Sequence, residues 1–413
     1  MTTVVFASHG SLGDLVPFLE IGKVLAARGH RVRVATHAAH RGAVEAAGLE
    51  HRPMRPDRPS DPAWHARFMH PRKGPPFVYR EFLSPAIADS DADLTDAVRG
   101  ADILVSVTLA LAAPIVAART GMPWLSSAFQ PAMLYSAIDP PKLPMLPFRR
   151  GKPQWNAWVL QSAKNGIERW ATPLRAYRRA QNLGEYADHP VFGGQHSPHG
   201  VLALYSPLFG PVPADAPPGT VQTGQILQTG GALPNDLAAF LNAGPPPIVF
   251  TLGSASAHIA RRFFHTAAAA AHSLGRRAVL LVGKDENRIP AGPNLFVATT
   301  APYQAVFPHA ALTVHQGGIG TIALSLSAGA PMLLTPFAHD QFDNAARAAR
   351  MGAARVIPHW RYRTAAASAL ARALSDRAMA DAAQRAAATI AAERGAQHAA
   401  DHILSTAKRL QSR

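Results

Sequence analysis

The residues with the clearest chemical potential form a glycine-rich run between an apolar strand and a helix that ends at Gly329. Glycine lets a ligand approach the backbone closely, and the first turn of a helix offers free N–H groups with a partial positive charge. The pattern is typical of a diphosphate site, to which a histidine and a threonine add donors. The alternative is a tight strand-to-helix turn with a histidine at its edge. The run consists of His315, Gln316, Gly317, Gly318, Ile319, Gly320 and Thr321.

A second polar cluster contains His339, Asp340 and Gln341 and follows the strand predicted over residues 332–335. Because the carboxyl ends of parallel strands meet at one edge of a sheet, this cluster is expected beside the diphosphate loop. A carboxylate accepts hydrogen bonds, and an amide both donates and accepts them, so Asp340 and Gln341 suit the hydroxyl groups of a sugar. The alternative is that Asp340 only caps the helix predicted over residues 342–351.

Taken in order, these motifs resemble the donor signature of the family 1 nucleotide-sugar glycosyltransferases: His-x-Gly-Gly-x-Gly-Thr, then Gly-x-Pro, then Asp-Gln. Residues 10–17 are similar to the first loop of bacterial members and of sterol glucosyltransferases, and residues 251–254 to the first loop of the second domain. Residues 337–345 and 196–200 are similar to stretches in the catalytic subunits of bacterial rhamnolipid rhamnosyltransferases. The resemblance covers nearly the whole chain. It implies the GT-B fold, in which two Rossmann-like domains face a cleft.

The resemblance also implies which residues hold the nucleotide sugar. Some of them contact the diphosphate, whereas Asp340 and Gln341 hold the sugar. Plant members stack a tryptophan on the nucleobase where this chain has Thr300, so base recognition is expected from backbone groups or from Tyr303. The choice between uracil and thymine therefore stays open. The full set is Gly13, Ser254, Tyr303, His315, Gly317, Gly318, Gly320, Thr321, His339, Asp340 and Gln341.

An inverting transfer of this kind needs a base that takes the acceptor proton as the acceptor oxygen attacks the anomeric carbon. Bacterial members that resemble this chain place an aspartate at the position of Asp14, which is therefore the first candidate, and His9 is the second. The alternatives are that Asp14 caps the helix predicted over residues 15–28 and that His9 is structural. The helix at Gly320, with His315, is expected to stabilise the leaving diphosphate. The nucleotide sugar is a co-substrate, and neither a cofactor nor a metal site is expected.

An acceptor site is expected within residues 133–177, which combine aromatic and basic side chains. The aromatic rings suit an apolar channel, and the arginines suit the carboxylate of a hydroxy fatty acid. The candidates are Arg149, Arg150 and Trp155. The alternatives are a solvated helical face whose tryptophans turn into the core, and peripheral contact with anionic lipid.

Strands and helices alternate around these motifs, and glycines end the helices, so two doubly wound α/β domains with parallel sheets are predicted. The expected division is a first domain over residues 1–210, a linker over 211–246, a second domain over 247–385 and a C-terminal helix over 386–413. The alternative for the final helix is that it returns to the first domain. Strands are predicted at residues 4–7, 31–36, 103–107, 124–127, 248–252, 278–282, 295–298, 312–315, 332–335 and 354–357.

Length and composition agree with this architecture. A chain of 413 residues suits two domains of roughly 200 residues each, and the 48% hydrophobic content is typical of a globular protein. Cysteine is absent, no signal peptide is evident, and the longest apolar stretch, 103–118, is too short to span a membrane. A soluble cytoplasmic protein is therefore expected, with peripheral membrane contact as an added alternative.

The net charge of +15 favours anionic partners, but the basic residues are spread along the chain. The first functional hypothesis is transfer of L-rhamnose from dTDP-L-rhamnose to a hydroxy-fatty-acid lipid. The second is transfer of glucose from UDP-glucose to a sterol, polyketide or other hydrophobic alcohol. The third is nucleic-acid binding, which leaves the residues from His315 to Gln341 unexplained. The fourth is a protein of the same fold that binds nucleotide sugar without transferring it.

Overall fold

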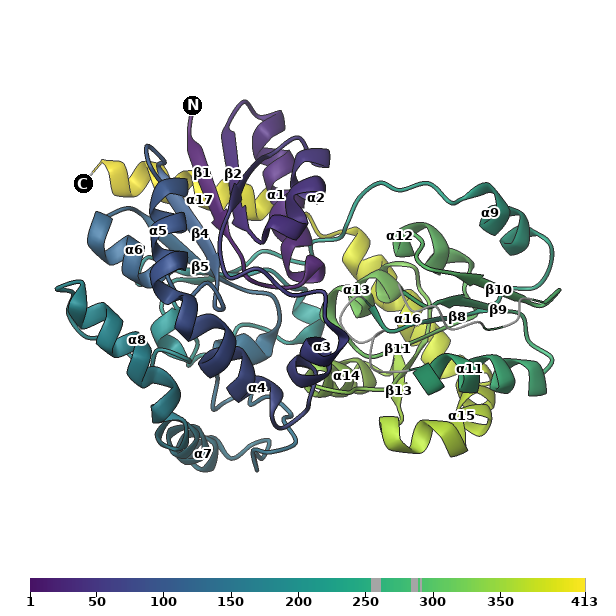
Figure 1. The fold of residues 1–413 in the computed structure, drawn as a ribbon. Helices are drawn as coiled ribbons and strands as arrows, with labels where there is room; N and C mark the ends of the chain where they lie inside the picture. The colour runs from purple at the N-terminus through teal and green to yellow at the C-terminus, as the bar shows by residue number, and fades with distance from the viewer. Residues whose placement is uncertain (254–260, 284–288, 290–291, 413) are drawn as a thin grey trace. The chain divides into compact units, whose positions relative to one another are not determined.

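The computed structural model describes residues 1–253, 261–283, 289 and 292–412, and it contains two parallel β-sheets, each in its own compact unit (Figure 1). Unit 1 comprises residues 1–59, 75–226 and 394–413, and unit 2 comprises residues 60–74 and 227–393. The predicted α/β class, with two Rossmann-like domains, is confirmed.

The sheet of unit 1 has the strand order β3-β2-β1-β4-β5-β6-β7, and all of its neighbouring strands are parallel. Its strands are β1 (Thr3–Ala7), β2 (Arg31–Thr36), β3 (Glu50–Pro53), β4 (Ile103–Val107), β5 (Trp124–Ala128), β6 (Val201–Ala203) and β7 (Thr220–Gln222). Its longer helices are α1 (Leu12–Ala27), α2 (Arg41–Ala46), α5 (Ile87–Ala97), α6 (Ala113–Thr120), α7 (Pro153–Gly166), α8 (Glu168–Ala180) and α17 (Gly395–Gln411).

The C-terminal helix α17 packs against α1 within unit 1, where Figure 1 shows it in yellow beside the purple α1. Arg28 at the end of α1 forms an ion pair with Asp401 of α17 at 2.5 Å. Near the other end of α17, Gln411 donates to the carboxylate of Asp102 at 2.6 Å. The last segment of the chain is thereby fixed to α1 and to the residue that precedes β4.

The sheet of unit 2 has the order β10-β9-β8-β11-β12-β13 and is also parallel throughout its described strands. Its strands are β8 (Ile248–Thr251), β9 (Ala278–Leu281), β10 (Leu295–Ala298), β11 (Leu312–His315), β12 (Met332–Leu334) and β13 (Ala354–Val356). Its helices include α3 (Pro62–Phe68), α9 (Asn235–Asn242), α11 (Arg261–Ser273), α12 (Tyr303–Val306), α13 (Ile319–Ser327), α14 (Gln341–Arg350), α15 (His359–Leu374) and α16 (Arg377–Ala391), and α4 (Gly74–Pro76) begins at its border.

The four inner strands of the unit 2 sheet, β8, β9, β11 and β12, are buried throughout, which explains why they read as continuous apolar runs. Successive residues of a strand point to opposite faces. Ile248 and Phe250 of β8 accordingly belong to one core cluster, whereas Val249 belongs to the other. The two core clusters pack on opposite faces of the sheet. The loops described below follow the carboxyl ends of β8, β11 and β12.

Three strands of unit 1 were not predicted. β3 and β7 are the edge strands, and their sequences, EHRP and TVQ, lack an apolar run. β6, which is only three residues long, pairs with β7. The segment predicted as a linker, 211–246, therefore contains β7 and also α9. None of the helices in the described part of the chain combines the length and apolar character needed to cross a membrane.

Candidate functional site

The predicted diphosphate loop lies between β11, which ends at His315, and α13, which begins at Ile319. Gly317 has a φ of 90°, a left-handed conformation that glycine adopts without strain, so the chain can turn sharply into the helix. The first N–H groups of α13 have no partner within the helix. Gly320 is exposed, and a Cβ atom placed on it would meet nothing within 4 Å. A phosphate group can thus reach the start of α13.

His315 is fully buried, and its ring bonds inside unit 2. Its Nδ1 atom accepts from the N–H of Gly317 at 3.2 Å, and its Nε2 atom lies 3.5 Å from the Ser325 hydroxyl oxygen. Burial lowers the pKa of His315 to about 3, so the ring is neutral at pH 7. In this geometry His315 shapes the loop by accepting from the N–H of Gly317.

A second loop follows β8 and meets the first through Gln316. Gly253 has a left-handed φ of 64°, which favours glycine, and a Cβ atom on it would lie 2.6 Å from Gln316 Nε2, so the two loops approach closely here. Gln316 is buried, and its Oε1 atom has no hydrogen-bond partner within the part of the chain that the structure describes. The sequence pattern placed Gln316 in the glycine-rich run but did not predict it as a ligand. The predicted phosphate ligand Ser254 lies outside the described residues.

Tyr303, the predicted nucleobase contact, is held within unit 2 at the start of α12. Its hydroxyl lies 2.6 Å from the Thr251 hydroxyl, which in turn accepts from the N–H of Gly253 at 3.3 Å. Its ring stacks on Phe307 with a centroid distance of 5.0 Å. Burial raises the pKa of Tyr303. The tyrosine therefore supports the loop after β8 through its hydroxyl.

The predicted sugar residues lie at the start of α14, for which Asp340 is the N-terminal cap residue. The buried amide of Gln341 accepts from the N–H groups of Phe337 and Ala338 at 2.9 and 3.1 Å. Its Oε1 atom thereby fixes the turn that connects β12 to α14. The preceding residue, His339, has a left-handed φ of 54°.

A fully buried asparagine, Asn344, joins the diphosphate loop to the sugar residues. Its amide nitrogen donates to the carbonyl of Gly317 at 3.2 Å and to the carboxylate of Asp340 at 2.6 Å. The two clusters predicted separately are therefore parts of one hydrogen-bonded assembly. Sequence reasoning missed the role of Asn344. The available signal was its position one helical turn after Asp340, where i and i+4 side chains meet.

In unit 1, the loop after β1 presents Asp14 at the start of α1. The Oδ2 atom of Asp14 accepts from the N–H of Ser11 at 2.6 Å and from its hydroxyl at 2.8 Å. Asp14 is half-buried, and the neighbouring Gly13 is exposed. The helix begins at Leu12 and its cap residue is Ser11, so the alternative that Asp14 is the cap residue is wrong. Asp14 is the third helical residue, and its Oδ2 atom completes a capping box with Ser11.

His9, the second candidate base, is buried directly behind this loop. Its Nε2 atom donates to the carbonyl of Arg55 at 2.8 Å, and its Nδ1 atom is enclosed by protein. Burial lowers the pKa of His9 to about 4. The carbonyl of His9 accepts from His37 at 3.1 Å and from Arg58 at 3.4 Å. This arrangement suits a support for the loop better than a base.

The surroundings of Asp14 carry basic groups. Burial lowers the pKa of Arg58 and of His40, whereas the Asp14 carboxylate acts in the opposite direction on both. Such mutual interaction shows that both side chains lie within electrostatic reach of Asp14.

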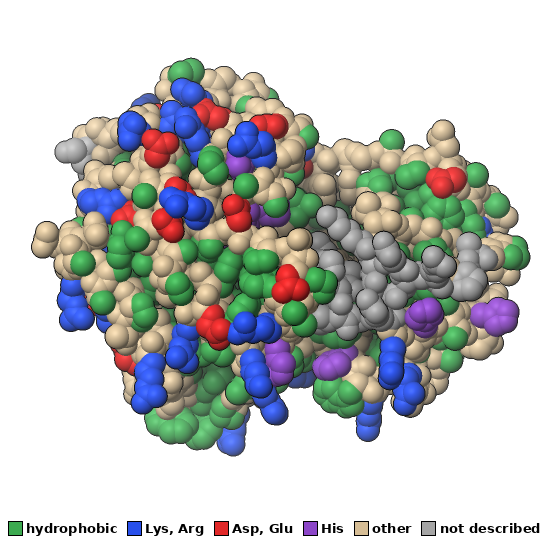
Figure 2. Space-filling view, in the orientation of Figure 1, with side chains coloured by type: hydrophobic (Ala, Val, Ile, Leu, Met, Phe, Trp, Pro, Cys, Tyr) green, Lys and Arg blue, Asp and Glu red, His purple; other side chains and the backbone are tan. Residues whose placement is uncertain are grey.

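The predicted acceptor segment forms a loop and the start of α7. The buried Asn156 organises it by bonding to the backbone N–H and carbonyl of Arg149, both at 2.8 Å. The Arg149 guanidinium lies 4.7 Å from the ring centroid of Trp155, and Trp155 pairs with Trp158 at 5.1 Å. Arg150 is exposed. In Figure 2, hydrophobic and basic side chains gather at the lower left, over the region of α7.

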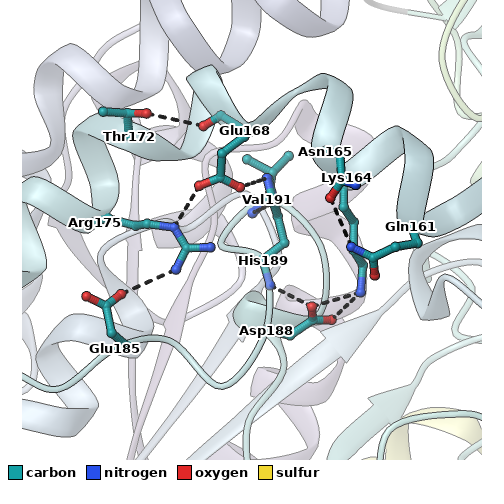
Figure 3. A network of polar contacts seen from close by, with 10 residues as sticks. All are labelled: Gln161, Lys164, Asn165, Glu168, Thr172, Arg175, Glu185, Asp188, His189 and Val191. Atoms are coloured by element: carbon teal, nitrogen blue, oxygen red, sulfur yellow. Dashed lines mark hydrogen bonds and ion pairs between the residues drawn. The ribbon is translucent and has the colours of Figure 1, made fainter.

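The hairpin of α7 and α8 is anchored by a polar network (Figure 3). Lys164 of α7 bonds to both carboxylate oxygens of Asp188 at 2.8 Å. Arg175 of α8 contacts Glu168 at 3.0 Å and Glu185 at 3.3 Å. Lys164 and Arg175 therefore bind the hairpin to the segment over residues 185–191. Arg149 and Arg150 remain the better candidates for contact with an acceptor.

Comparison with known proteins identifies the family. The C-terminal domain of the erythromycin biosynthesis protein CIII-like family matches residues 281–405. The chain is 34% identical to the O-mycaminosyltylonolide 6-deoxyallosyltransferase of Streptomyces fradiae, over 96% of this chain and 95% of that protein. It is 29% identical to the vancomycin aglycone glucosyltransferase of Amycolatopsis orientalis, over 84% of each chain.

Among solved structures, the spinosyn rhamnosyltransferase SpnG in complex with thymidine diphosphate shares the fold, with a TM-score of 0.70, 20% identity, and coverage of 98% of this chain and 100% of that chain. The 34% identity to the Streptomyces fradiae enzyme extends over nearly the full length of both chains, so it shows a common family as well as a common fold. The chain belongs to the family 1 nucleotide-sugar glycosyltransferases of the GT-B fold, in the group of the antibiotic glycosyltransferases.

Proposed function

We propose that the enzyme transfers a 6-deoxyhexose from a dTDP-linked donor, with dTDP-L-rhamnose favoured, to a hydroxyl of a hydrophobic or amphipathic acceptor such as a hydroxy-fatty-acid lipid. One observation carries the donor half of this proposal. Asn344 connects Gly317 in the diphosphate loop to Asp340 at the sugar residues, so both parts of a nucleotide sugar meet a single bonded assembly.

Two comparisons support a dTDP-linked deoxysugar. A structural relative is a rhamnosyltransferase solved with thymidine diphosphate, and a relative in sequence is named as a 6-deoxyallosyltransferase. Rhamnose in particular is favoured because of the resemblance, noted from the sequence alone, of residues 337–345 and 196–200 to rhamnolipid rhamnosyltransferases.

The proposed reaction inverts the anomeric carbon. Asp14 takes the proton of the acceptor hydroxyl while the acceptor oxygen forms a bond to the anomeric carbon. The bond between that carbon and the diphosphate oxygen breaks, and the diphosphate leaves with the electron pair. Charge therefore develops on the diphosphate, where the N–H groups and dipole of α13 stabilise it. His315 contributes by holding Gly317 in place.

The acceptor is assigned to the segment around Arg149 and Trp155. An aromatic ring with a guanidinium 4.7 Å from its centroid offers an apolar surface beside a positive charge. Such a surface suits a hydrocarbon chain that ends in a carboxylate. The exposed side chains of Met145 and Trp158 extend the apolar surface and support peripheral contact with anionic lipid as part of the same proposal.

The second candidate is transfer of glucose from UDP-glucose to a sterol, polyketide or other hydrophobic alcohol. The 29% identity to a vancomycin aglycone glucosyltransferase favours it. Thermal unfolding in the presence of UDP, dTDP and their sugar conjugates separates the candidates, because a ligand that binds the folded state raises the melting temperature. Greater stabilisation by dTDP and dTDP-L-rhamnose is expected. Greater stabilisation by UDP and UDP-glucose would favour the second candidate.

A further inference from the structure

Residues 60–74, here named the strap, come from the first part of the sequence but belong to unit 2. The carboxylate of Asp61 caps α3 by accepting from the N–H of Ala63 at 2.9 Å. After α3, the Nδ1 atom of His70 accepts from the N–H of Lys73 at 3.0 Å. The strap is therefore an ordered helix and turn rather than a simple connection.

The strap contacts the residue that directly precedes the predicted sugar ligands. The Nε2 atom of His339 donates to the carbonyl oxygen of Phe68 at 2.9 Å, and the two rings lie 5.3 Å apart. Phe68 in turn stacks on Trp64 of the same helix at 5.2 Å. A polar bond and an aromatic contact thus join α3 to the turn before α14.

Gly74 makes room for this contact. It is buried at the end of the strap, and a Cβ atom on it would lie 2.3 Å from the Phe68 carbonyl oxygen and 3.2 Å from His339 Cε1. Any other side chain at position 74 would therefore displace the oxygen that accepts from His339. The contact depends on both ends of the strap.

The backbone of His339 shows why the contact matters. A left-handed φ of 54° is uncommon for a residue other than glycine and persists where surrounding interactions impose it. On one side of His339, the N–H of Ala338 is held by Gln341 at 3.1 Å. On the other side, Asp340 is held by Asn344 at 2.6 Å. His339 is the point of this turn to which the strap is bound.

We propose that the strap is part of the donor-sugar site and that His339 is a positioning residue, which holds Asp340 and Gln341 in the orientation that the sugar requires. This inference rests on the proposed function of Asp340 and Gln341. The nucleoside diphosphate without its sugar does not need these two residues. The strap therefore affects the affinity for the sugar, whereas the loop at Gly317 binds the diphosphate.

Two substitutions break the contact from opposite sides. His339→Gly removes the ring while it keeps the left-handed backbone free of strain. Gly74→Ala displaces the Phe68 carbonyl and leaves His339 intact. Because the net value of one hydrogen bond corresponds to about a three- to tenfold change in an equilibrium, each variant is expected to raise the KM for the nucleotide sugar by about that factor. The Kd of the free nucleoside diphosphate, measured by calorimetry, stays unchanged. Gly42→Ala is the matched control, since a Cβ there meets nothing within 4 Å.

Limited digestion with trypsin reports on the strap directly. Arg67, Arg72 and Lys73 are exposed, and cleavage requires the backbone to leave its ordered conformation. Both variants are expected to be cut within the strap faster than the wild type. Nucleotide sugar is expected to slow the cutting of the wild type more than the nucleoside diphosphate does.

A KM for the nucleotide sugar that matches the wild type in both variants would overturn the proposal, whether or not the strap is cut faster. An equal rise in the KM and in the Kd of the nucleoside diphosphate would also overturn it, because that result assigns the contact to general folding. If instead the wild type turns over no nucleotide sugar, the proposed function fails. The protection of the strap in the wild type then tests the inference by itself.

Discussion

The side-chain amide of Asn344 donates a 2.6 Å hydrogen bond to the carboxylate of Asp340 and a second bond, of 3.2 Å, to the carbonyl of Gly317. One buried side chain thus sets the distance between the diphosphate loop and the residues assigned to the sugar. In a nucleotide sugar the diphosphate and the sugar are covalently joined, so their separation is limited. The Asn344 bridge therefore preorganises the two parts of the donor site that would bind them.

Removal of the bridge is expected to weaken both stability and donor binding. Asn344→Ala removes the hydrogen bond from the buried Asn344 amide to the Asp340 carboxylate, and the loss of a hydrogen bond to a charged group costs roughly 1.5–3 kcal/mol. Chemical unfolding measures the stability, and calorimetry with the nucleotide sugar measures the affinity. The exposed Asn242 in the same unit provides the control Asn242→Ala. Equal stability of the two variants would show that the bridge is unimportant.

The proposed sugar role of Asp340 is separable from its role in the folded structure, which is to accept from Asn344. The Asp340 side chain makes no cap bond to the helix, and an asparagine at this position still accepts from Asn344 through a neutral oxygen, so Asp340→Asn should lower stability by about 1 kcal/mol. Affinity for the sugar conjugate is expected to fall about tenfold or more, while affinity for the free nucleoside diphosphate stays near the wild-type value. If both affinities fall together, Asp340 acts on the diphosphate loop and not on the sugar.

The buried His315 predicts a loss of stability in acid. Its pKa is about 3 in the folded protein and about 6.5 when unperturbed, so below pH 6.5 the unfolded chain binds a proton that the folded protein does not. The free energy of unfolding therefore falls by about 1.4 kcal/mol per pH unit from this group between pH 6.5 and 3, and the contribution is complete above pH 6.5.

Urea unfolding at pH 7 and pH 5 tests this linkage. His9 and His37 also have pKa values lowered by burial, to about 4 and about 3, so the wild-type slope includes several histidines. His315→Gln should reduce the slope of the free energy of unfolding against pH by the equivalent of about one proton. The same substitution is also expected to lower stability at pH 7. An unchanged slope would mean that His315 does not titrate in the unfolding reaction.

The acceptor proposal predicts a dependence on the acceptor's charge. Arg149→Gln combined with Arg150→Gln should raise the KM for a hydroxy fatty acid with a free carboxylate and leave the KM for its methyl ester nearly unchanged. Both arginines are exposed, and an exposed ion pair is worth about 0.2–1 kcal/mol, so a change of up to about fivefold is expected. Steady-state kinetics with both acceptors decides the point. The same change for acid and ester would assign the two arginines to folding or to another ligand.

The sequence predicted the fold well where apolar residues dominate. The predicted strand at residues 312–315 agrees with β11, because a strand buried on both faces reads as a continuous apolar run. The strand predicted at residues 295–298 agrees with β10, which is a partly exposed edge strand but still has an apolar sequence, LFVA. The edge strands β3 and β7 escaped prediction because they are short and lack such a run.

The residue types in the sequence were enough to locate the candidate site, but they did not predict the directions and contacts of its side chains. The glycine run and the Asp-Gln pair mark their loops by composition alone. The direction of Gln341, whose oxygen turns back to the N–H groups of Phe337 and Ala338, depends on the turn between β12 and α14. The contact of His339 with Phe68 joins segments that are 271 residues apart, and no local pattern encodes it.

The central claim is tested most directly by the release of dTDP from dTDP-L-rhamnose, with wild-type enzyme and with Asp14→Asn, in the presence of a hydroxy-fatty-acid acceptor. NMR of the product gives the anomeric configuration in the same experiment. The account predicts an inverted glycoside from the wild type and a rate lower by about 10²–10⁴ for Asp14→Asn, with unchanged dTDP affinity. The exposed Asp401→Asn serves as the control. Retention of the anomeric configuration, or a wild-type rate in Asp14→Asn, would contradict it.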